Sequence, residues 1–219
     1  MQQAPAVASE AAHEVTVVVV TYNSRAILRE TLPPLAGLPH LVVVDNASRD
    51  DTVASVRALA PRATLIEAGA NLGFGRANNL ALERVTTPYA LLLNPDCLLQ
   101  PGPREALEAL LAAARRYPDA AILAPRLYDA PGVLGLCYRP AFWQAQPKTL
   151  LDPEGDVCSE FLTGAAMLLD MARLRAVGFF DPWFFLYLED DDLCLRVRRA
   201  GHSLVLVHDA TVLHRVKRS

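Results

Sequence analysis

Residues 14–32, EVTVVVVTYNSRAILRETL, decide the fold class of this chain, because they join an apolar β-branched run to a segment with helical periodicity. The run VTVVVV has no sustained polar alternation, which is typical of a strand buried on both faces of a parallel sheet. Polar residues then lead to Ser24, a predicted helix N-cap, and to an apolar stripe of Ile27, Leu28 and Leu32. The stretch therefore predicts a strand followed by an amphipathic helix.

Further strand-then-helix units follow this one. The predicted strands are residues 40–45, 63–68 and 89–99, and the predicted helices lie within residues 48–59, 69–85 and 103–118. Ser48 and Asp51 form a candidate capping box for the first of these helices, and Pro103 begins the last one. Strands that alternate with helices predict an α/β fold, with a doubly wound, mostly parallel sheet flanked by helices.

The pattern is less regular in the second half of the chain. Residues 120–160 contain five prolines and no sustained period, so we expect a long connection with one or two short strands. A strand is predicted at residues 161–169, followed by a short helix that ends at Gly178. An acid-rich segment then begins a last helix that ends at Gly201, and residues 202–214 form the last predicted strand.

Composition limits the class of protein. A chain of 219 residues that is 52% hydrophobic and 21% charged can bury one sizeable core. The net charge of −3 gives no general attraction to nucleic acid, so no nucleic-acid partner is expected. The four cysteines form no CxxC pair, which indicates reduced thiols. Because no leader or membrane-spanning run is evident, we expect a soluble cytoplasmic protein.

Polar residues follow each of the first four predicted strands. They are Thr21, Tyr22 and Asn23; Asp45 and Asn46; Asn71, Gly73, Gly75 and Arg76; and Asn94, Pro95 and Asp96. Turn formation alone explains any one group. All four groups at one edge of a parallel sheet favour a binding site. An acidic site binds a diphosphate only through a divalent cation, so Asp96 suggests a hard metal ion.

Four acids stand side by side at residues 189–192, next to apolar residues at helical spacing. The helical period places Asp190 on the apolar stripe that faces the sheet. Asp192 lies one turn from Arg196, which predicts an i, i+4 ion pair, and Asp191 is expected to face solvent. Carboxylates at a helix N-terminus are also stabilised by the helix dipole. The acids can therefore both cap the helix and take part in chemistry.

Several segments together resemble a known family. They are VVVTYNS, VVVDNASRDDT, NLGFGRANN, LLLNPDC, FLTGAAMLL and FFLYLEDDDLCLR. The set is similar to the inverting family-2 glycosyltransferases with the GT-A fold, and most closely to their rhamnosyltransferase-like branch. The resemblance runs from about residue 15 to residue 214. It implies one GT-A domain at 14–219, with a nucleotide-binding half at about 14–118 and an acceptor-binding, catalytic half at about 119–219. Residues 1–13 are Ala/Gln-rich and aperiodic, which predicts a flexible N-terminus.

The resemblance also implies roles for single residues. Thr21, Tyr22 and Asn23 would lie along the nucleotide, Asp45 with Asn46 would meet the base, and Asn71, Gly75 and Arg76 would lie near the base and ribose. Asp96 and His214 would bind the metal ion, Mg²⁺ or Mn²⁺, with Asn94 in place of the family's first metal-binding acid. Asp190 would be the general base, with Glu189 and Asp192 as its neighbours in the catalytic segment.

The implied partners are a nucleotide-diphospho-sugar donor and a glycan or lipid-linked acceptor, and dTDP-rhamnose is the first choice of donor. Polysaccharide or cell-wall synthesis is the implied process. Two other functions remain open: a sugar-phosphate nucleotidyltransferase and an inactive nucleotide-binding scaffold. Residues 183–187 are aromatic-rich and could be core or an acceptor wall. A homo-oligomer is also left open. The basic residues near the end of the sequence could form a solvated face or contact the inner face of a membrane; they are Arg196, Arg198, Arg199, Arg215, Lys217 and Arg218.

Overall fold

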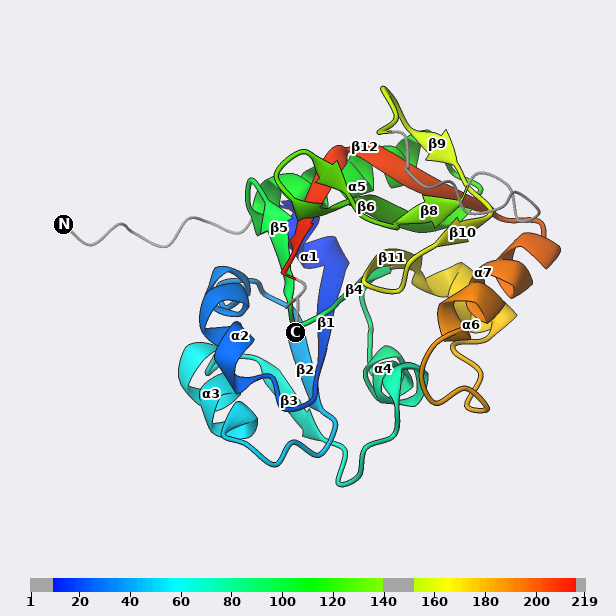
Figure 1. The fold of residues 1–219 in the computed structure, drawn as a ribbon. Helices are drawn as coiled ribbons and strands as arrows, with labels where there is room; N and C mark the ends of the chain where they lie inside the picture. The colour runs from blue at the N-terminus through cyan, green and yellow to red at the C-terminus, as the bar shows by residue number, and fades with distance from the viewer. Residues whose placement is uncertain (1–9, 140–151, 216–219) are drawn as a thin grey trace.

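The computed structural model describes residues 10–139 and 152–215, which fold around one mixed β-sheet (Figure 1). The strand order along the sheet is β3-β2-β1-β4-β11-β6-β12-β5, with β7 beside β6 and β9 beside β12, and β8 pairs separately with β10. The strands are β1 Val15–Thr21, β2 Leu41–Asp45, β3 Thr64–Glu67, β4 Tyr89–Leu93, β5 Cys97–Gln100, β6 Ala120–Ala130, β7 Val133–Leu134, β8 Tyr138–Arg139, β9 Val157–Cys158, β10 Phe161–Leu162, β11 Ala166–Asp170 and β12 Ser203–His214.

Helices cover the sheet on both sides. They are α1 Glu10–Glu14, α2 Arg25–Thr31, the 3₁₀ helix η1 Pro33–Leu35, α3 Thr52–Leu59, α4 Phe74–Leu82, α5 Pro103–Arg116, α6 Met171–Val177 and α7 Glu189–Arg199. In Figure 1, α2 and α3 lie on one side of β1 to β3, and α4 lies on the other. The predicted α/β sheet flanked by helices is thus confirmed.

The N-terminal half is the parallel part of the sheet, as the β-branched runs predict. β1 pairs in parallel with β2 and β4, and β2 pairs in parallel with β3. Val17, Val18 and Val43 are completely buried between the helices on the two faces. This burial explains why the strands carry apolar residues at consecutive positions. The parallel pairing also brings the carboxyl ends of β1, β2 and β3 to one edge of the sheet.

The predicted strand at residues 89–99 is wrong in one respect, because it forms two strands. β4 ends at Leu93, and β5 begins at Cys97 at the far end of the sheet order. Between them, the amide of Cys97 donates to the carbonyl of Asn94 at 3.0 Å, which closes a turn. The polar residues of this turn therefore lie where the chain leaves the parallel half of the sheet.

Residues 120–139 also differ from the prediction of a mostly irregular connection. They include β6, an eleven-residue strand that pairs in parallel with β12 and antiparallel with β11. Pro125 counted against a strand in the sequence, since proline lacks an amide donor. The structure tolerates it because the β6–β12 register shifts between Val207 and Thr211, next to Pro125. Residues 140–151 of the predicted connection lie outside the described residues.

The helix N-terminal signals read from the sequence are only partly right. Ser24 is the N-cap of α2, but its side chain makes no capping hydrogen bond and its Oγ donates to the Tyr22 carbonyl instead. The capping box of Ser48 and Asp51 does not form, because α3 begins at Thr52. The amide of Ser48 instead donates to the Asp45 carboxylate at 2.9 Å. Polar residues after these strands therefore order the turns rather than the helices.

The N-terminal segment is more ordered than the sequence predicted. Residues 10–13 were expected to be flexible, yet they belong to α1, in which Ala11 and Ala12 are buried. Glu14 at the end of this helix pairs with Arg115 of α5 at 2.6 Å. This helix is five residues long and buries only two alanines, so the sequence shows no apolar periodicity that would predict a helix here. Residues 1–9 lie outside the described residues.

Residues 180–188, here called the α6–α7 loop, are held against α4. The amide of Phe74 donates to the Phe185 carbonyl at 3.0 Å, and the Asn79 side chain bonds both backbone groups of Phe180. A glycine makes this approach possible: a Cβ on Gly73 would lie 1.9 Å from the Phe185 carbonyl oxygen. The φ of Gly73 is also +83°, which disfavours any other residue.

Replacing Gly73 by alanine should therefore displace the α6–α7 loop. Gly69→Ala is the control, since Gly69 has a similar φ of +74° but nothing within 4 Å of an added Cβ. We expect Gly69→Ala to lower the free energy of unfolding by about 1–2 kcal/mol through backbone strain, and Gly73→Ala to lower it further. Urea unfolding measures both losses. Limited proteolysis should cleave the loop faster only in Gly73→Ala, and equal cleavage in the two variants would contradict this contact.

Candidate active site

The strand ends surround a cavity of about 300 Å³. Its lining comes from the ends of β1, β2 and β4, the N-terminus of α4 and the α6–α7 loop: Val20, Tyr22, Ser24, Asn46, Asn71, Gly73, Phe74, Asn94, Pro95, Asp96, Phe185 and Leu186. A second cavity of about 200 Å³ adjoins it and shares Ser24, Pro95 and Asp96 with it. The polar groups that the sequence placed at one sheet edge thus come together, and Asp96 lies on the wall between the two cavities.

Two asparagines build the floor of the larger cavity. The side-chain amide of Asn46 donates to Asn71 Oδ1 at 2.9 Å and to the Gly73 carbonyl at 3.2 Å. Asn46 Oδ1 accepts from the Leu72 amide at 2.8 Å. Asn46 is 4% exposed, so these bonds satisfy a buried amide. The network fixes the backbone before α4 and leaves Asn71 open to the cavity.

Asp45 is not among the residues that line the two cavities. It is 3% exposed, its Oδ2 accepts from the Ser48 amide, and its Oδ1 accepts from the hydroxyl of Thr21 at 3.3 Å. Thr21 is completely buried. Asn23 is exposed and lines the smaller cavity, with its Oδ1 bonded to the Arg49 amide. In this conformation Thr21 and Asp45 order the strand ends that carry the cavity.

Gly75 and Arg76 are not among the residues that line either cavity. Gly75 packs under the α6–α7 loop, where an added Cβ would lie 2.8 Å from Phe180 Cβ and 3.7 Å from Glu189 Cβ. Arg76 Nε donates to the Pro182 carbonyl at 2.6 Å. The structure thus shows both residues holding the loop that covers the cavity.

A candidate metal site lies beside the cavity, where Asp96 meets His214. His214 Nε2 is 3.3 Å from Asp96 Oδ2, and both side chains are partly exposed. The pKa of His214 is raised above its ordinary value, first by the hydrogen bond to Asp96 and further by the charges of Asp96 and Asp129. The carboxylate oxygen of Asp96 suits both Mg²⁺ and Mn²⁺ as a ligand. The imidazole nitrogen of His214 suits Mn²⁺ better than Mg²⁺. These residues therefore fit a divalent cation.

Cys97 belongs to the same cluster by distance but not by chemistry. Its sulfur lies with the Asp96 and His214 ligand atoms in a group within 4.8 Å. However, Cys97 is 1% exposed, and its Sγ donates to the Ala165 carbonyl at 3.6 Å. Burial raises the pKa of this thiol well above its usual value. Since a hard cation prefers oxygen ligands, Cys97 is part of the core beneath the site.

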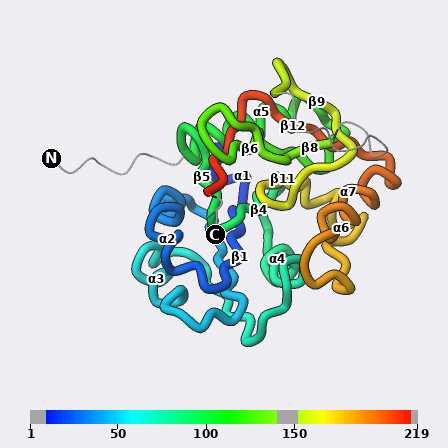
Figure 2. Tube along the Cα trace, viewed as in Figure 1, coloured from blue at the N-terminus to red at the C-terminus, as the bar shows by residue number. Residues whose placement is uncertain are grey.

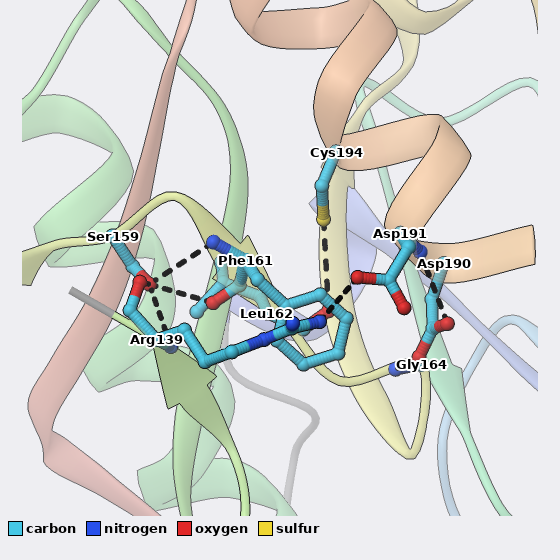
Figure 3. Close-up of polar contacts among 8 residues, drawn as sticks. All are labelled: Arg139, Ser159, Phe161, Leu162, Gly164, Asp190, Asp191 and Cys194. Carbon is cyan, nitrogen blue, oxygen red and sulfur yellow. Dashed lines mark hydrogen bonds and ion pairs between the residues drawn. The ribbon is translucent and has the colours of Figure 1, made fainter. Parts of the chain in front are cut away.

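Asp190 is held at the N-terminus of α7 by backbone amides (Figure 3). Its Oδ2 accepts from the Gly164 amide at 2.9 Å, and its Oδ1 accepts from the Asp191 amide at 3.0 Å. Burial is the main cause that raises the pKa of this carboxyl. Neither Asp190 nor Gly164 is among the residues that line the two cavities. Gly164 lies between Asp190 and the lining residue Phe74, since an added Cβ would be 3.2 Å from the Phe74 ring and 3.5 Å from Asp190 Cβ.

The other acids of the segment have separate partners. Asp192 pairs with Arg196 at 2.7 Å, which confirms the predicted i, i+4 pair. The expectation that Asp191 faces solvent is wrong, because it pairs with Arg139, whose guanidinium lies 4.1 Å from the centre of the Phe161 ring (Figure 3). No local sequence pattern predicts this pair, since Arg139 is 52 residues away.

Glu189 is the acid whose environment is least satisfied. It is 5% exposed, and its Oε2 has no hydrogen-bond partner among the described residues. Burial, followed by the charges of Asp190 and Asp191, raises the pKa of this carboxyl. Tyr187 and Leu188 just before it have φ of 68° and 70°, which non-glycine residues seldom adopt. Strain and an unpaired buried acid thus gather at this turn, as they do at many functional sites.

Comparison with known proteins settles the family. Residues 16–171 match the family described as Glycosyl transferase family 2. The chain belongs to this family. The curated family-2 relative N-acetylglucosaminyl-diphospho-decaprenol L-rhamnosyltransferase of Mycobacterium tuberculosis is 30% identical, over 90% of this chain and 75% of the relative. The predicted rhamnosyltransferase-like glycosyltransferase is therefore confirmed at the level of the family and its enzyme class.

Solved structures confirm the fold that is expected for family 2. GalNAc-T7 with UDP, GalNAc and Mn²⁺ superimposes with a TM-score of 0.72 at 14% identity, over 91% of this chain and 43% of that chain. The Pyrobaculum calidifontis mannosyltransferase with GDP-Man and Mn²⁺ gives a TM-score of 0.68 at 21% identity, over 94% of this chain and 58% of that chain. This chain spans less than two thirds of either solved chain. Both structures share the GT-A arrangement.

The basic residues near the end of this family-2 chain are largely paired. Arg196 pairs with Asp192, Arg198 pairs with Glu160, and Arg215 pairs with Glu30. Lys217 and Arg218 lie outside the described residues. These pairings favour the solvated-face interpretation over a cationic membrane patch. Among residues 10–139 and 152–215, no helix has the length and apolar character of a membrane span.

The buried Glu189 leads to a prediction about stability and pH. A carboxyl whose pKa is higher in the folded than in the unfolded protein favours folding while protonated, and this contribution is lost as rising pH ionises it. We expect Glu189→Gln to unfold at a higher temperature than wild type at pH 8, because the amide is uncharged. The difference should shrink as pH falls through the raised pKa.

Thermal unfolding at several pH values between 4 and 8 measures this difference. Glu83→Gln is the control, since Glu83 is exposed and shows no such burial. A Glu189→Gln variant that is less stable than wild type at pH 8 would show that an unseen partner stabilises the ionised acid.

Proposed function

We propose that this protein moves a sugar from a nucleotide-diphospho-sugar to an acceptor hydroxyl, with inversion and with Mg²⁺ or Mn²⁺ at Asp96 and His214. One observation carries the proposal: a single cavity joins the polar strand ends to Asp96, and Gly164 links Asp190 to Phe74, which lines that cavity. In this proposal the cavity is the donor site, Asp96 and His214 are the cation site, and Asp190 is the base. Transfer between a nucleotide sugar and a hydroxyl needs these three parts.

The donor would occupy the larger cavity. Tyr22 and Asn71 would offer an aromatic face and an amide group to the nucleotide, with Asn46 holding Asn71, and Asn94 would lie beside the diphosphate near Asp96. Asn23 borders the adjoining cavity. Thr21 and Asp45 would act from behind, with Asp45 reaching the base only if its bond to Thr21 opens. Gly75 and Arg76 would contribute through the α6–α7 loop, whose Phe185 and Leu186 also line the cavity.

Asp190 would act as the general base. The acceptor hydroxyl gives its proton to this carboxylate while its oxygen bonds to the anomeric carbon, and the bond from that carbon to the diphosphate breaks on the opposite face. The amides of Gly164 and Asp191 hold the carboxylate in place. The raised pKa makes Asp190 a stronger base than an exposed aspartate. A bound cation would stabilise the negative charge of the departing diphosphate.

The acceptor would approach over the exposed aromatic residues of the α6–α7 loop. Trp183 is 86% exposed and Tyr187 is 76% exposed, so neither is part of the core. Trp183 lies six residues before Glu189 in the chain, and Tyr187 lies two residues before it. Flat aromatic faces bind the apolar faces of sugars, which supports the acceptor-wall interpretation. Glu189 and Asp192 would support the acceptor side through the turn and the helix that carry Asp190.

The rhamnosyltransferase of Mycobacterium tuberculosis supports the choice of substrates. The name of that enzyme describes L-rhamnosyl transfer to a diphospho-decaprenol-linked sugar. By this similarity we propose dTDP-rhamnose as donor and a lipid-linked glycan as acceptor, in polysaccharide or cell-wall synthesis. Such an acceptor would bring the protein to the inner face of a membrane as a peripheral protein. The family assignment disfavours the nucleotidyltransferase and the inactive scaffold.

A donor panel tests the reaction. We expect the purified protein with Mn²⁺ or Mg²⁺ to release dTDP from dTDP-rhamnose, faster than UDP from UDP-sugars. Excess EDTA should abolish the release, and added Mn²⁺ should restore it, because the charge of the leaving diphosphate needs the cation. Release of pyrophosphate would indicate a nucleotidyltransferase instead. Full activity in EDTA would exclude the cation from the mechanism.

Single substitutions test which acid is the base. Asp190→Asn should lower transfer by about 10²- to 10⁴-fold, the usual contribution of a general base, with little change in the affinity for nucleoside diphosphate. Asp192→Asn is the matched control on the same helix, and it should lower transfer far less because it only loses the pair with Arg196. Transfer rates and calorimetric titration measure both effects. A larger loss of transfer in Asp192→Asn than in Asp190→Asn would contradict the assignment of Asp190 as the base.

A further inference from the structure

The pairing of β12 with two strands brings a second acid to His214. In the parallel pair with β6, Leu213 lies opposite Tyr128, so His214 and Asp129 are the next residues along. In the antiparallel pair with β5, His214 lies opposite Cys97, which follows Asp96. The imidazole is thus placed between two carboxylates. Nε2 faces Asp96 Oδ2 at 3.3 Å, and Nδ1 faces Asp129 Oδ1 at 3.5 Å.

These two contacts have different consequences for the imidazole ring. A neutral imidazole carries one proton, so it donates from one nitrogen and presents a lone pair at the other. A metal ion that is shared with Asp96 needs the lone pair at Nε2. The ring proton must then be at Nδ1, where Asp129 is the acceptor. Without that acceptor, the neutral ring would place its proton at Nε2, toward the Asp96 carboxylate, and so block the metal ion.

The β6–β7 hairpin holds Asp129 for this contact. The amide of Gly135 donates to the Leu127 carbonyl at 2.8 Å, and this bond joins the two arms of the hairpin, with Asp129 between the bonded residues in the chain. A Cβ on Gly135 would lie 2.8 Å from Asp129 Oδ1, so glycine leaves room for the carboxylate. Among the described residues, His214 is the ion-pair partner found for Asp129. The carboxylate is 45% exposed and is therefore not needed to satisfy the core.

We propose that Asp129 is a positioning residue that accepts a hydrogen bond from Nδ1–H of His214 and so keeps Nε2 free to bind the divalent cation beside Asp96. The inference rests on the proposed metal-dependent transfer and deepens it. Asp129 is not itself a ligand in this arrangement, because it faces the ring nitrogen opposite Asp96 and lies outside the ligand-atom cluster of Asp96, Cys97 and His214. Its role is that of a carboxylate that orients a metal-binding histidine from behind.

Binding of Mn²⁺ alone, followed by the electron paramagnetic resonance signal of the free ion, tests the proposal. We expect Asp129→Ala to weaken Mn²⁺ binding by about 10- to 100-fold, as is usual for loss of such a partner. Asp129→Asn should recover most of this loss, because its amide oxygen still accepts from Nδ1–H. Asp209→Ala is the matched control, since it removes an exposed carboxylate from β12 itself and should leave the affinity unchanged.

The position of the ring proton gives a readout that needs no metal ion and no activity. Nitrogen-15 spectra of histidine-labelled, metal-free protein, at a pH where the ring is neutral, distinguish Nδ1–H from Nε2–H. The signals of His214 are those missing from His214→Ala. We expect a larger Nδ1–H population in wild type and Asp129→Asn than in Asp129→Ala. A role in stability alone would leave this population unchanged.

The outcomes separate the two proposals. If wild type and His214→Ala bind Mn²⁺ equally, the proposed cation site is wrong and this inference is overturned with it. If His214→Ala loses affinity but Asp129→Ala keeps both the affinity and the ring-proton distribution of wild type, only the positioning role is overturned. Loss of affinity in Asp129→Ala together with a shift of the proton to Nε2 supports it.

Discussion

The pairing of β12 between β6 and β5 is the constraint on which the site depends. β12 follows α7 and runs along β6 toward β5 (Figure 2). Its last residue, His214, pairs with Cys97, which follows Asp96. A parallel neighbour on one side and an antiparallel neighbour on the other place a different acid at each ring nitrogen. A shift of one residue in either register would turn His214 to the other face of the sheet. The proposed cation site thus depends on strand register.

The acids at the start of α7 show how one short segment can hold four like charges. Each has a different environment: Asp190 accepts from backbone amides, Asp191 pairs with Arg139, Asp192 pairs with Arg196, and Glu189 is buried without a partner at one oxygen. The pairs and the positive end of the helix dipole reduce the repulsion among the carboxylates. Burial raises the pKa of two of these carboxyls, that of Asp190, which is bonded only to backbone amides, and that of Glu189. Local stability and base strength therefore come from the same division of partners.

Close approaches of backbone, permitted by glycine, connect the two halves of the site. Gly73 and Gly75 let the α6–α7 loop lie on α4, and Gly164 lets Asp190 approach Phe74. Phe74 and Phe180 then meet edge to face, with ring centres 5.7 Å apart. These contacts bring the acid-bearing helix to the parallel sheet that carries the proposed nucleotide-binding residues. Gly75 and Arg76, for which the family resemblance implied donor binding, therefore hold the loop that lines the cavity.

The sequence by itself determined the parallel half of the sheet, its helices and the gathering of polar strand ends, because apolar periodicity and turn residues are local properties. It also determined the pair of Asp192 with Arg196, which needs only the helical repeat. Only the tertiary structure decided that β5 lies far from β4, that β6 is a central strand despite Pro125, and that Gly75 and Arg76 hold a loop. It also decided the partners Asp129 and Arg139, which lie 85 and 52 residues from His214 and Asp191 respectively. Strand order, register and such contacts join distant segments, so no local pattern encodes them.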